Sequence, residues 1–255
     1  MGKKFWEIKA KANNPSEADI YLYIEIASWG GGYCAHSAQS FTEELESLGD
    51  ISTLNVYINS PGGDVFEGYA IFNVLRRKAD NCQINVYIDG MAASIASVIA
   101  MAGTHISMPS NAVMMIHRAS IGIYGNSDVL AKGIKFLEKI DNNMKQTYIN
   151  RSNGKLDDST LDFLFSNGDT WLTAQECLEY GLCDEVTEEI KISAKYDSKA
   201  LGNYKNIPKA FLNTQNNERR MNDEKKQKID ADVKALIDRV NNKINNWNME
   251  ENNYE

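Results

Sequence analysis

The sequence predicts an α/β fold of repeated strand–turn–helix units around a mostly parallel sheet. Short runs rich in β-branched and aromatic residues recur between residues 20 and 116, and segments with apolar residues at helical spacing follow them. Glycine-rich turns separate these runs from the helical segments. Parallel strands have their carboxyl ends at the same edge of a sheet, so these turns are expected to meet there.

Composition excludes several classes of function. The chain has 255 residues, 43% of them hydrophobic, which suffices for one large domain or two small ones. A formal net charge of −8 argues against a nucleic-acid partner. The longest apolar stretch, Met91–Ala102, is too short to span a membrane, and the N-terminus lacks the pattern of a signal peptide. We therefore expect a cytoplasmic protein.

The sequence offers no convincing site for a metal or cofactor. Cys34, Cys82, Cys177 and Cys183 form no CxxC pair, so they indicate buried or free thiols in a reducing compartment. The three consecutive glycines of Trp29–Tyr33 lack the Lys-Ser/Thr of a phosphate-binding P-loop and indicate a plain loop. We expect neither a metal nor a cofactor.

The N-terminal part contains the first strand and helix. Met1–Asp19 is mixed and polar, with a breaker at Asn13–Pro15. Ile20–Ala27 is rich in β-branched and aromatic residues and predicts a strand. Apolar residues recur at helical spacing in Ala35–Leu48, which predicts a helix with one buried face.

The second unit contains a glycine pair between a strand and a helix. Ile51–Asn59 predicts the strand, Ser60–Asp64 (SPGGD) the turn, and Val65–Arg77 the helix. Glycines allow a positive φ, and such a turn exposes backbone N–H groups that could hold an oxyanion. A plain connecting turn would have the same sequence pattern.

The third unit carries a serine at the equivalent turn. We expect the strand Ile84–Asp89 to stop at Gly90, and the following residues to turn into a buried helix with Ser94 near its start. A hydroxyl there lies beside free N–H groups and the positive end of the helix dipole, which suits a nucleophile whose reaction makes an oxyanion. Taken alone, a serine that only caps a core helix is the commoner explanation.

One of the three histidines is expected at the same sheet edge as this serine. Residues 105–108 and 112–116 predict two short strands, and His117 ends the second of them. His105 opens its strand and is expected at the opposite end, and His36 lies in or near the first helix. His117 therefore has the best position for a general base.

The rest of the domain is mainly helical. Ser127–Asn150 predicts a long helix and Ser159–Phe165 a shorter one. Thr173–Tyr180 predicts a helix that begins with a capping box between Thr173 and Glu176. Asp184–Val186 is expected to form a last short strand.

These features provide every part of a serine hydrolase. Ser94 would attack a carbonyl carbon, and His117 would take its proton and pass it to the leaving group. Asp169 would hold the imidazole in the required tautomer, although Asp162 and Asp184 are nearby in sequence and stay open as alternatives. The oxyanion would be held by backbone N–H groups of the glycine turn and the helix start, from Gly62, Gly63 and Ile95.

Four segments resemble the motifs of ClpP-type serine peptidases, in the order and at about the spacing of that family. They are INSPGG at Ile58–Gly63, GMAAS at Gly90–Ser94, MMIH at Met114–His117 and DTWLTAQECLEYGLCDEV at Asp169–Val186. The resemblance covers roughly residues 20–186 and is greatest to the ClpP-related head maturation (prohead) proteases of tailed bacteriophages and prophages.

The resemblance implies a crotonase-like ClpP fold of ββα-type units. It also implies a homo-oligomer of heptameric rings, often stacked in pairs around a chamber and joined by a long handle helix, which here matches the helix from Ser127. By resemblance, Ser94, His117 and Asp169 match the triad, and Gly63 and Ile95 match the oxyanion donors.

The chain also departs from the family pattern. Arg118-Ala119 stands where the family usually has Gln-Pro, so the substrate cleft is expected to differ. Met1–Asp19 does not look like the axial-loop segment through which housekeeping members meet their ATPase, which puts a Clp ATPase partner in doubt. The tail after Asp197 has no housekeeping counterpart, and we hypothesise that it binds a capsid or scaffold protein or is removed by self-cleavage.

We therefore expect three parts: a ClpP-like serine protease domain at 1–195, a linker at 196–223, and a C-terminal helix or tail at 224–255. The last part has a 4-3-4-3 apolar spacing, typical of a short coiled coil, although a disordered tail stays open. The residues with this spacing are Val233, Ile237, Val240, Ile244 and Trp247.

The leading hypothesis is an ATP-independent serine endopeptidase that acts in phage head assembly in the cytoplasm of the bacterial host. A housekeeping-like ClpP subunit fed by an ATPase would keep the fold and change the role. An acyl-CoA enzyme of the crotonase type would share the fold and the oxyanion hole without needing a Ser–His pair. A non-catalytic assembly scaffold would use the tail helix as its working part.

Overall fold

The structure is a computed structural model that describes residues 4–27, 37–189 and 204–207. Within these ranges the strands are β1 (Glu7–Lys11), β2 (Asn14–Leu22), β3 (Thr53–Ser60), β4 (Gln83–Ala93), β5 (His105–Pro109), β6 (Val113–Ile116), β7 (Thr170–Thr173) and β8 (Glu185–Thr187). The helices are α1 (Ala38–Glu46), α2 (Val65–Lys78), α3 (Ile95–Ala100), α4 (Ser127–Arg151), α5 (Asp158–Ser166) and α6 (Ala174–Tyr180).

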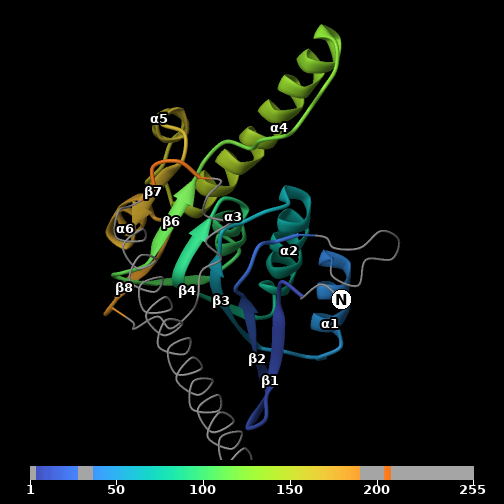
Figure 1. The fold of residues 1–255 in the computed structure, drawn as a ribbon. Coiled ribbons are helices and arrows are strands. Elements are labelled where there is room, and N and C mark those ends of the chain that lie inside the picture. Colours follow the sequence, from blue (N-terminus) through green and yellow to red (C-terminus); the bar gives the residue numbers. More distant parts are fainter. Residues whose placement is uncertain (1–3, 28–36, 190–203, 208–255) are drawn as a thin grey trace, which may run out of the picture. The chain divides into compact units, whose positions relative to one another are not determined.

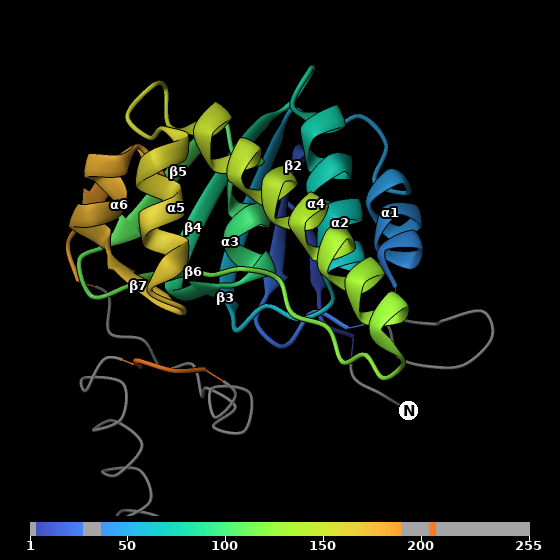
Figure 2. The same cartoon turned by 90° about the horizontal axis from the view of Figure 1, so that it is seen from above.

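The strands form one mixed sheet in the order β1-β2-β3-β4-β5-β8, with β6 paired to β4 and β7 paired to β6. The pairs β1–β2 and β6–β7 are antiparallel and the others are parallel. Helices α1, α2 and α3 cover one face, and α4 runs across their outer side (Figures 1 and 2). The predicted α/β class with a mostly parallel sheet is confirmed.

The two faces of the sheet follow from the alternation of side chains along the strands. Ile20, Val56 and Val86 are in register on β2, β3 and β4, and all three are buried in the core. Their neighbours form a ladder on the opposite face, where the rings stack with centroids about 5 Å apart. This ladder consists of Tyr21, Tyr57 and Tyr87.

The first two strands differ from the prediction. No strand was assigned to the mixed, polar residues before Asp19, but β1 and most of β2 lie there, and β2 ends at Leu22 instead of Ala27. The breaker around Pro15 lies at the turn between two antiparallel strands, where Lys11 is opposite Asn14 next to a register shift. Pro15 and its polar neighbours are exposed at this end of β2, so the pattern of a buried strand is missing.

The strand β4 was also predicted too short. It does not stop at Gly90 but continues to Ala93, because it changes partners along its length. Residues 85–87 pair with β5 and residues 91–93 pair with β6, with a register shift against β3 in between. Gly90 lies at this change of partner, where a residue without a side chain lets the strand bend. No strand was predicted between the short helix Ser159–Phe165 and the capping box at Thr173, but Thr170–Thr173 forms the strand β7, which pairs with β6.

The chain divides into two compact units, Met1–Asn206 and Ile207–Glu255. Apart from Ile207, the second unit lies outside the described residues, and so does the helix predicted within residues 224–255. The predicted loop Trp29–Tyr33 lies outside them as well. In the described ranges, no helix combines the length and the apolar character that crossing a membrane requires.

Candidate active site

Ser94 occupies the sharp turn between β4 and α3. Its φ of 55° is positive, which is uncommon for a residue with a side chain and is found where the surroundings hold a turn in place. Although Ser94 is at the N-cap position of α3, its side chain makes no capping hydrogen bond. Its hydroxyl instead lies 2.7 Å from Nε2 of His117. The simple helix-cap explanation is therefore wrong for this serine.

Strand pairing brings the three predicted triad residues together. In the register of β4 and β6, Ala93 is opposite Met115, so the residues that follow these strands are neighbours. Pairing of β6 with β7 likewise puts Asp169 beside His117, and Oδ1 of Asp169 lies 2.9 Å from Nδ1 of His117. Both side chains are largely buried, with 17% exposure for His117 and 12% for Asp169.

The alternative acids and bases lie elsewhere. Asp162 pairs with Lys145 at 2.8 Å, and Asp184 accepts a hydrogen bond of 2.7 Å from the N–H of Ile106. His105 lies near Asp184 and Glu185, at the end of the sheet where β5 begins. His36 lies outside the described residues. Of the candidates that the structure describes, only Asp169 contacts the histidine that contacts Ser94.

The glycine turn packs directly against Ser94. Gly62 and Gly63 have φ values of 93° and 144°, in the region that favours glycine. A Cβ atom on Gly62 would lie 2.7 Å from Cβ of Ser94, and one on Gly63 would lie 2.0 Å from the carbonyl oxygen of Ile26. Neither position leaves room for a side chain, so the backbone of this turn can approach the serine closely.

Backbone pairing decides which N–H groups of the turn can hold an oxyanion. The N–H of Gly62 donates to Oγ of Ser60 at 3.2 Å, so the geometry does not support its predicted part as a donor. Gly63 forms a parallel bridge with Ile26, in which the N–H of Ile26 donates to the carbonyl oxygen of Gly62 and the N–H of Asp64 donates to that of Ile26, each at 2.7 Å. The N–H of Gly63 takes no part in this bridge and is directed away from Ile26. Ile95 is the first residue of α3, and its N–H has no acceptor within the helix.

Hydrogen bonds from buried side chains fix the backbone next to Ser94 and His117. Ser97, one turn after Ser94, is fully buried and donates a hydrogen bond of 2.5 Å to the carbonyl oxygen of Ser94. Asp141 on α4 is also buried and accepts a hydrogen bond of 2.8 Å from the N–H of Ala119, two residues after His117. The first contact ties the backbone of Ser94 to α3, and the second ties the backbone just beyond His117 to α4.

Sequence reasoning missed one segment at the site, because it assigned residues 196–223 to a linker. Tyr204 lies against His117, with ring centroids 5.6 Å apart, and its hydroxyl donates to the carbonyl oxygen of Pro61. Burial raises the pKa of Tyr204 to about 12. The N–H of Lys205 donates to Oδ2 of Asp169. No motif or periodicity in this part of the sequence points to such contacts.

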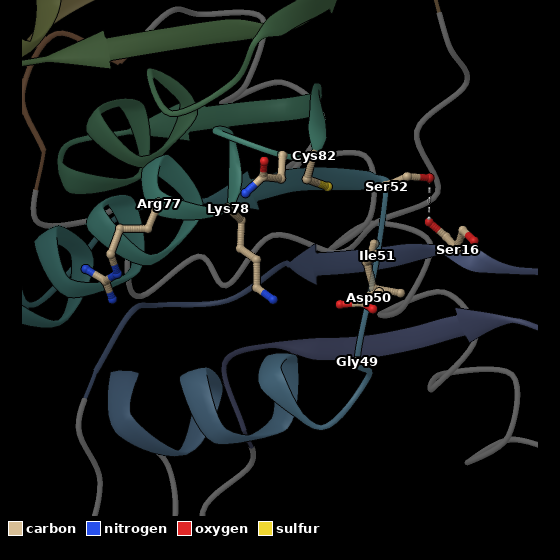
Figure 3. Close-up of a pocket in the computed structure, with 9 residues that line it drawn as sticks. Ser16, Gly49, Asp50, Ile51, Ser52, Arg77, Lys78 and Cys82 are labelled. Carbon is tan, nitrogen blue, oxygen red and sulfur yellow. Dashed lines mark hydrogen bonds between the residues drawn. The ribbon is translucent and has the colours of Figure 1, made fainter.

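A separate polar pocket of about 450 Å³ lies at the far end of the parallel strands (Figure 3). It is lined by Arg77 and Lys78 at the end of α2 and by Ser16 and Ser52 near the starts of β2 and β3. These are the amino ends of the strands, and Ser94 follows the carboxyl end of β4. The pocket therefore belongs to no part of the site. Within the described ranges, no cluster of His, Cys, Asp or Glu side chains could hold a metal ion.

A serine, a histidine and a carboxylate in one hydrogen-bonded chain, beside two backbone donors on an α/β sheet, define the class of a serine hydrolase. The family model described as Clp protease matches residues 33–190, and the chain belongs to the Clp protease family of serine-type peptidases. The predicted ClpP-type fold and the peptidase class are thereby confirmed.

Curated relatives agree with this family. The chain is 31% identical over 160 residues to the ATP-dependent Clp protease proteolytic subunit of Porphyromonas gingivalis, a match that covers 62% of this chain and 69% of the relative. It is also 31% identical over 157 residues to the protein of the same name from Bacteroides fragilis, covering 60% of this chain and 73% of the relative. The corresponding protein of Bacteroides thetaiotaomicron is similar at the same identity.

Proposed function

We propose that this chain is a serine endopeptidase in which Ser94 is the nucleophile, His117 the general base and Asp169 the group that orients the histidine. The observation that supports this proposal is the continuous chain of contacts from Ser94 to His117 at 2.7 Å and from His117 to Asp169 at 2.9 Å. A base within hydrogen-bond distance of a nucleophile, itself held by a third group, is the arrangement that activates a hydroxyl.

The reaction would follow two steps of acyl transfer. Oγ of Ser94 attacks the peptide carbonyl while Nε2 of His117 takes its proton, and the oxyanion is held by the N–H groups of Gly63 and Ile95. His117 then protonates the leaving amine, the C–N bond breaks and an ester to Ser94 remains. A water molecule gives its proton to His117 and attacks this ester, which releases the acid product and restores the Ser94 hydroxyl.

Labelling with a fluorophosphonate and mapping of the modified peptide tests the triad. We expect the label on Ser94 in the wild type, and no label in Ser94→Ala or His117→Ala. His105→Ala is the matched control, because this histidine lies outside the site, and it should label at the wild-type rate. Absence of label from a folded, oligomeric wild type and also from variants that uncover the site by removing the Tyr204 side chain would contradict the proposed chemistry and favour a non-catalytic scaffold.

We further propose that the chain forms a homo-oligomer of heptameric rings, with α4 as the contact between two stacked rings. The first half of α4 and the loop before it carry many exposed apolar side chains, and this end of the helix extends beyond the sheet (Figure 1). Exposed apolar surface of this extent marks an interaction site. The side chains are Ile121, Ile123, Tyr124, Val129, Leu130, Ile134 and Phe136. Native mass spectrometry of Ile134→Glu should show single rings where the wild type shows pairs.

The substrate proposed here is a capsid or scaffold protein that is cut during phage head maturation in the host cytoplasm, without an ATPase. Two departures from the family pattern favour a role different from that of a housekeeping subunit. Arg118 and Ala119 follow the histidine where the family usually has Gln-Pro, and toward the N-terminus Glu7–Lys11 and Asn14–Leu22 are strands instead of an extended loop through which an ATPase would bind. The alternative is a subunit that needs an ATPase, which the names of the curated relatives favour.

A degradation assay separates these two roles. The chain is incubated with a folded substrate in the presence and absence of a Clp ATPase and ATP, and separately with capsid and scaffold proteins. Cleavage of capsid or scaffold protein without ATPase is the expected result. Degradation of the folded substrate only when ATPase and ATP are both present would establish the alternative.

A further inference from the structure

The segment Tyr204–Asn206 contacts the catalytic site at three points. The Tyr204 hydroxyl donates to the carbonyl oxygen of Pro61, in the turn that carries Gly62 and Gly63. Its ring stands edge-on to His117, with a centroid distance of 5.6 Å and an interplanar angle of 79°. The N–H of Lys205 donates to Oδ2 of Asp169. The segment thus covers the glycine turn, the base and the carboxylate together.

The wall of the site holds the backbone of this segment in place. Nε1 of Trp171, on β7, donates to the carbonyl oxygen of Lys205 at 3.0 Å, and the Trp171 ring stands edge-on to Tyr204 at 6.3 Å. Asn206 has a positive φ of 57°, so the chain turns there. Hydrogen bonds to the backbone N–H and carbonyl of Lys205 and a half-buried aromatic ring are what a bound peptide would use at such a site.

The contacts do not correspond to a peptide bond that is ready for cleavage. The bond between Tyr204 and Lys205 lies at Asp169, because the N–H of that bond donates to Oδ2 of Asp169. Asp169 is separated from Ser94 by the whole imidazole ring of His117. Within the described segment 204–207, the group that reaches Ser94 is the phenol of Tyr204, which contains no carbonyl carbon to attack.

The triad is complete beneath the segment. The N–H of Lys205 uses Oδ2 of Asp169, and Oδ1 stays bound to His117 at 2.9 Å. His117 keeps its contact with Ser94 at 2.7 Å. Removal of the segment would therefore expose an assembled site, and no rearrangement of the three residues would be needed.

We propose that Tyr204–Asn206 is an intramolecular plug that holds the peptidase inactive until a substrate or partner displaces it. This inference rests on the proposed function of the site. The plug blocks the approach of substrate to Ser94 with the Tyr204 side chain, and its backbone occupies the positions on Asp169 and Trp171 where a substrate backbone would bind. Substrate must compete with a segment of the same chain, so a short peptide is a poor substrate for the wild type.

The test measures the rate constant for fluorophosphonate labelling of Ser94 in the full-length chain. Tyr204→Ala should raise this rate constant by about tenfold or more, which corresponds to about 1.4 kcal/mol of competition. Tyr204→Phe keeps the ring and loses the bond to Pro61, so it should give a smaller rise. Lys205→Pro lacks the N–H that Asp169 binds, and it should raise the rate constant with Tyr204 still present.

The control is Phe163→Ala, which removes an aromatic side chain on α5 that is 65% exposed, and it should label at the wild-type rate. Equal rate constants for wild type, Tyr204→Ala and Lys205→Pro would overturn the plug and leave the proposed function intact. No label in any of these folded proteins would overturn the proposed function and the plug with it. Release of a fragment cut next to Tyr204, seen by intact mass, would make the segment a substrate and also overturn the plug.

Discussion

The hydroxyl groups of Ser97 and Tyr148 lie 2.8 Å apart in the interior, where they join α3 to α4. Ser97 gives its only hydroxyl proton to the carbonyl oxygen of Ser94, so Tyr148 must be the donor to Ser97. Burial raises the pKa of Tyr148, which keeps this donor protonated. A long surface helix is thus connected to the turn that carries the candidate nucleophile.

Ser97→Ala should destabilise the protein by about 1–3 kcal/mol, because it leaves the buried Tyr148 hydroxyl without its partner. Tyr148→Phe should cost less, about 0.5–1.5 kcal/mol for one hydrogen bond. In the double variant no orphaned donor remains, so its loss of unfolding free energy in urea should be smaller than the sum of the single losses. Strict additivity would show that the two hydroxyl groups are not coupled.

Gly63→Ala should abolish labelling of Ser94 and destabilise the fold. The new Cβ would lie 2.0 Å from the carbonyl oxygen of Ile26, so the turn would have to move away from the serine. Gly49→Ala is the matched control: its φ of 75° is also positive, but a Cβ there has nothing within 4 Å. The control should cost about 1 kcal/mol of unfolding free energy through backbone strain alone and keep full labelling. Normal labelling of Gly63→Ala would remove this turn from the site.

Asp169→Asn should lower kcat for peptide cleavage by about 10⁴-fold while the fold stays intact. The amide has nearly the size of the carboxylate, but it cannot stabilise the charged imidazole, and it favours the wrong tautomer of His117. Asp162→Asn is the control, because Asp162 pairs with Lys145 on the surface and not with the histidine. A similar kcat in both variants would exclude Asp169 as the third triad residue.

Much of this fold could be read from the sequence, because period-2 and helical spacing report directly on burial. The pattern failed where an element depends on its neighbours. The strand β4 passes through Gly90 because it changes from one partner strand to another, and no local signal records that change. Likewise, β7 is a strand only because Thr170–Thr173 pairs with β6.

The candidate site could likewise be predicted only in part. Ser94, His117 and Asp169 follow or precede strands, so their common edge could be predicted, but their distances depend on strand register. The hydrogen bond from the N–H of Gly62 to Oγ of Ser60 depends on the exact conformation of the turn. Tyr204 could not be found at all, because a segment without secondary structure reaches the site through a few contacts far apart in sequence.

Stability should fall at alkaline pH in a way that depends on Cys183. Burial, reinforced by Asp184, raises the pKa of this thiol from 9.0 to about 11 in the folded chain. Because the folded chain holds the proton of this thiol more tightly than the unfolded chain, the free energy of unfolding keeps its full value below pH 9. It then falls by about 2–3 kcal/mol as the pH rises from about 9 to about 11. Unfolding free energies measured across this range should fall less steeply for Cys183→Ala. Parallel curves for the two proteins would contradict this assignment.

Asp141 is predicted to act as a positioning residue for His117. Its buried carboxylate accepts a hydrogen bond of 2.8 Å from the N–H of Ala119, so α4 holds the backbone just beyond the histidine. Asp141→Ala would leave that N–H unpaired, and the loss of a bond to a charged group costs about 1.5–3 kcal/mol. We expect kcat for peptide cleavage to fall by about tenfold with little change in KM, because the base moves while the substrate contacts stay.

Asp141→Asn supplies the control for this prediction. Its side-chain oxygen can still accept from Ala119, so kcat should return to near the wild-type value even though the charge is gone. Ala119→Pro removes the same hydrogen bond from the other side, since proline has no N–H, and should resemble Asp141→Ala. If Asp141→Ala and Ala119→Pro lowered only the unfolding free energy and left kcat unchanged, Asp141 would stabilise the fold without positioning the histidine.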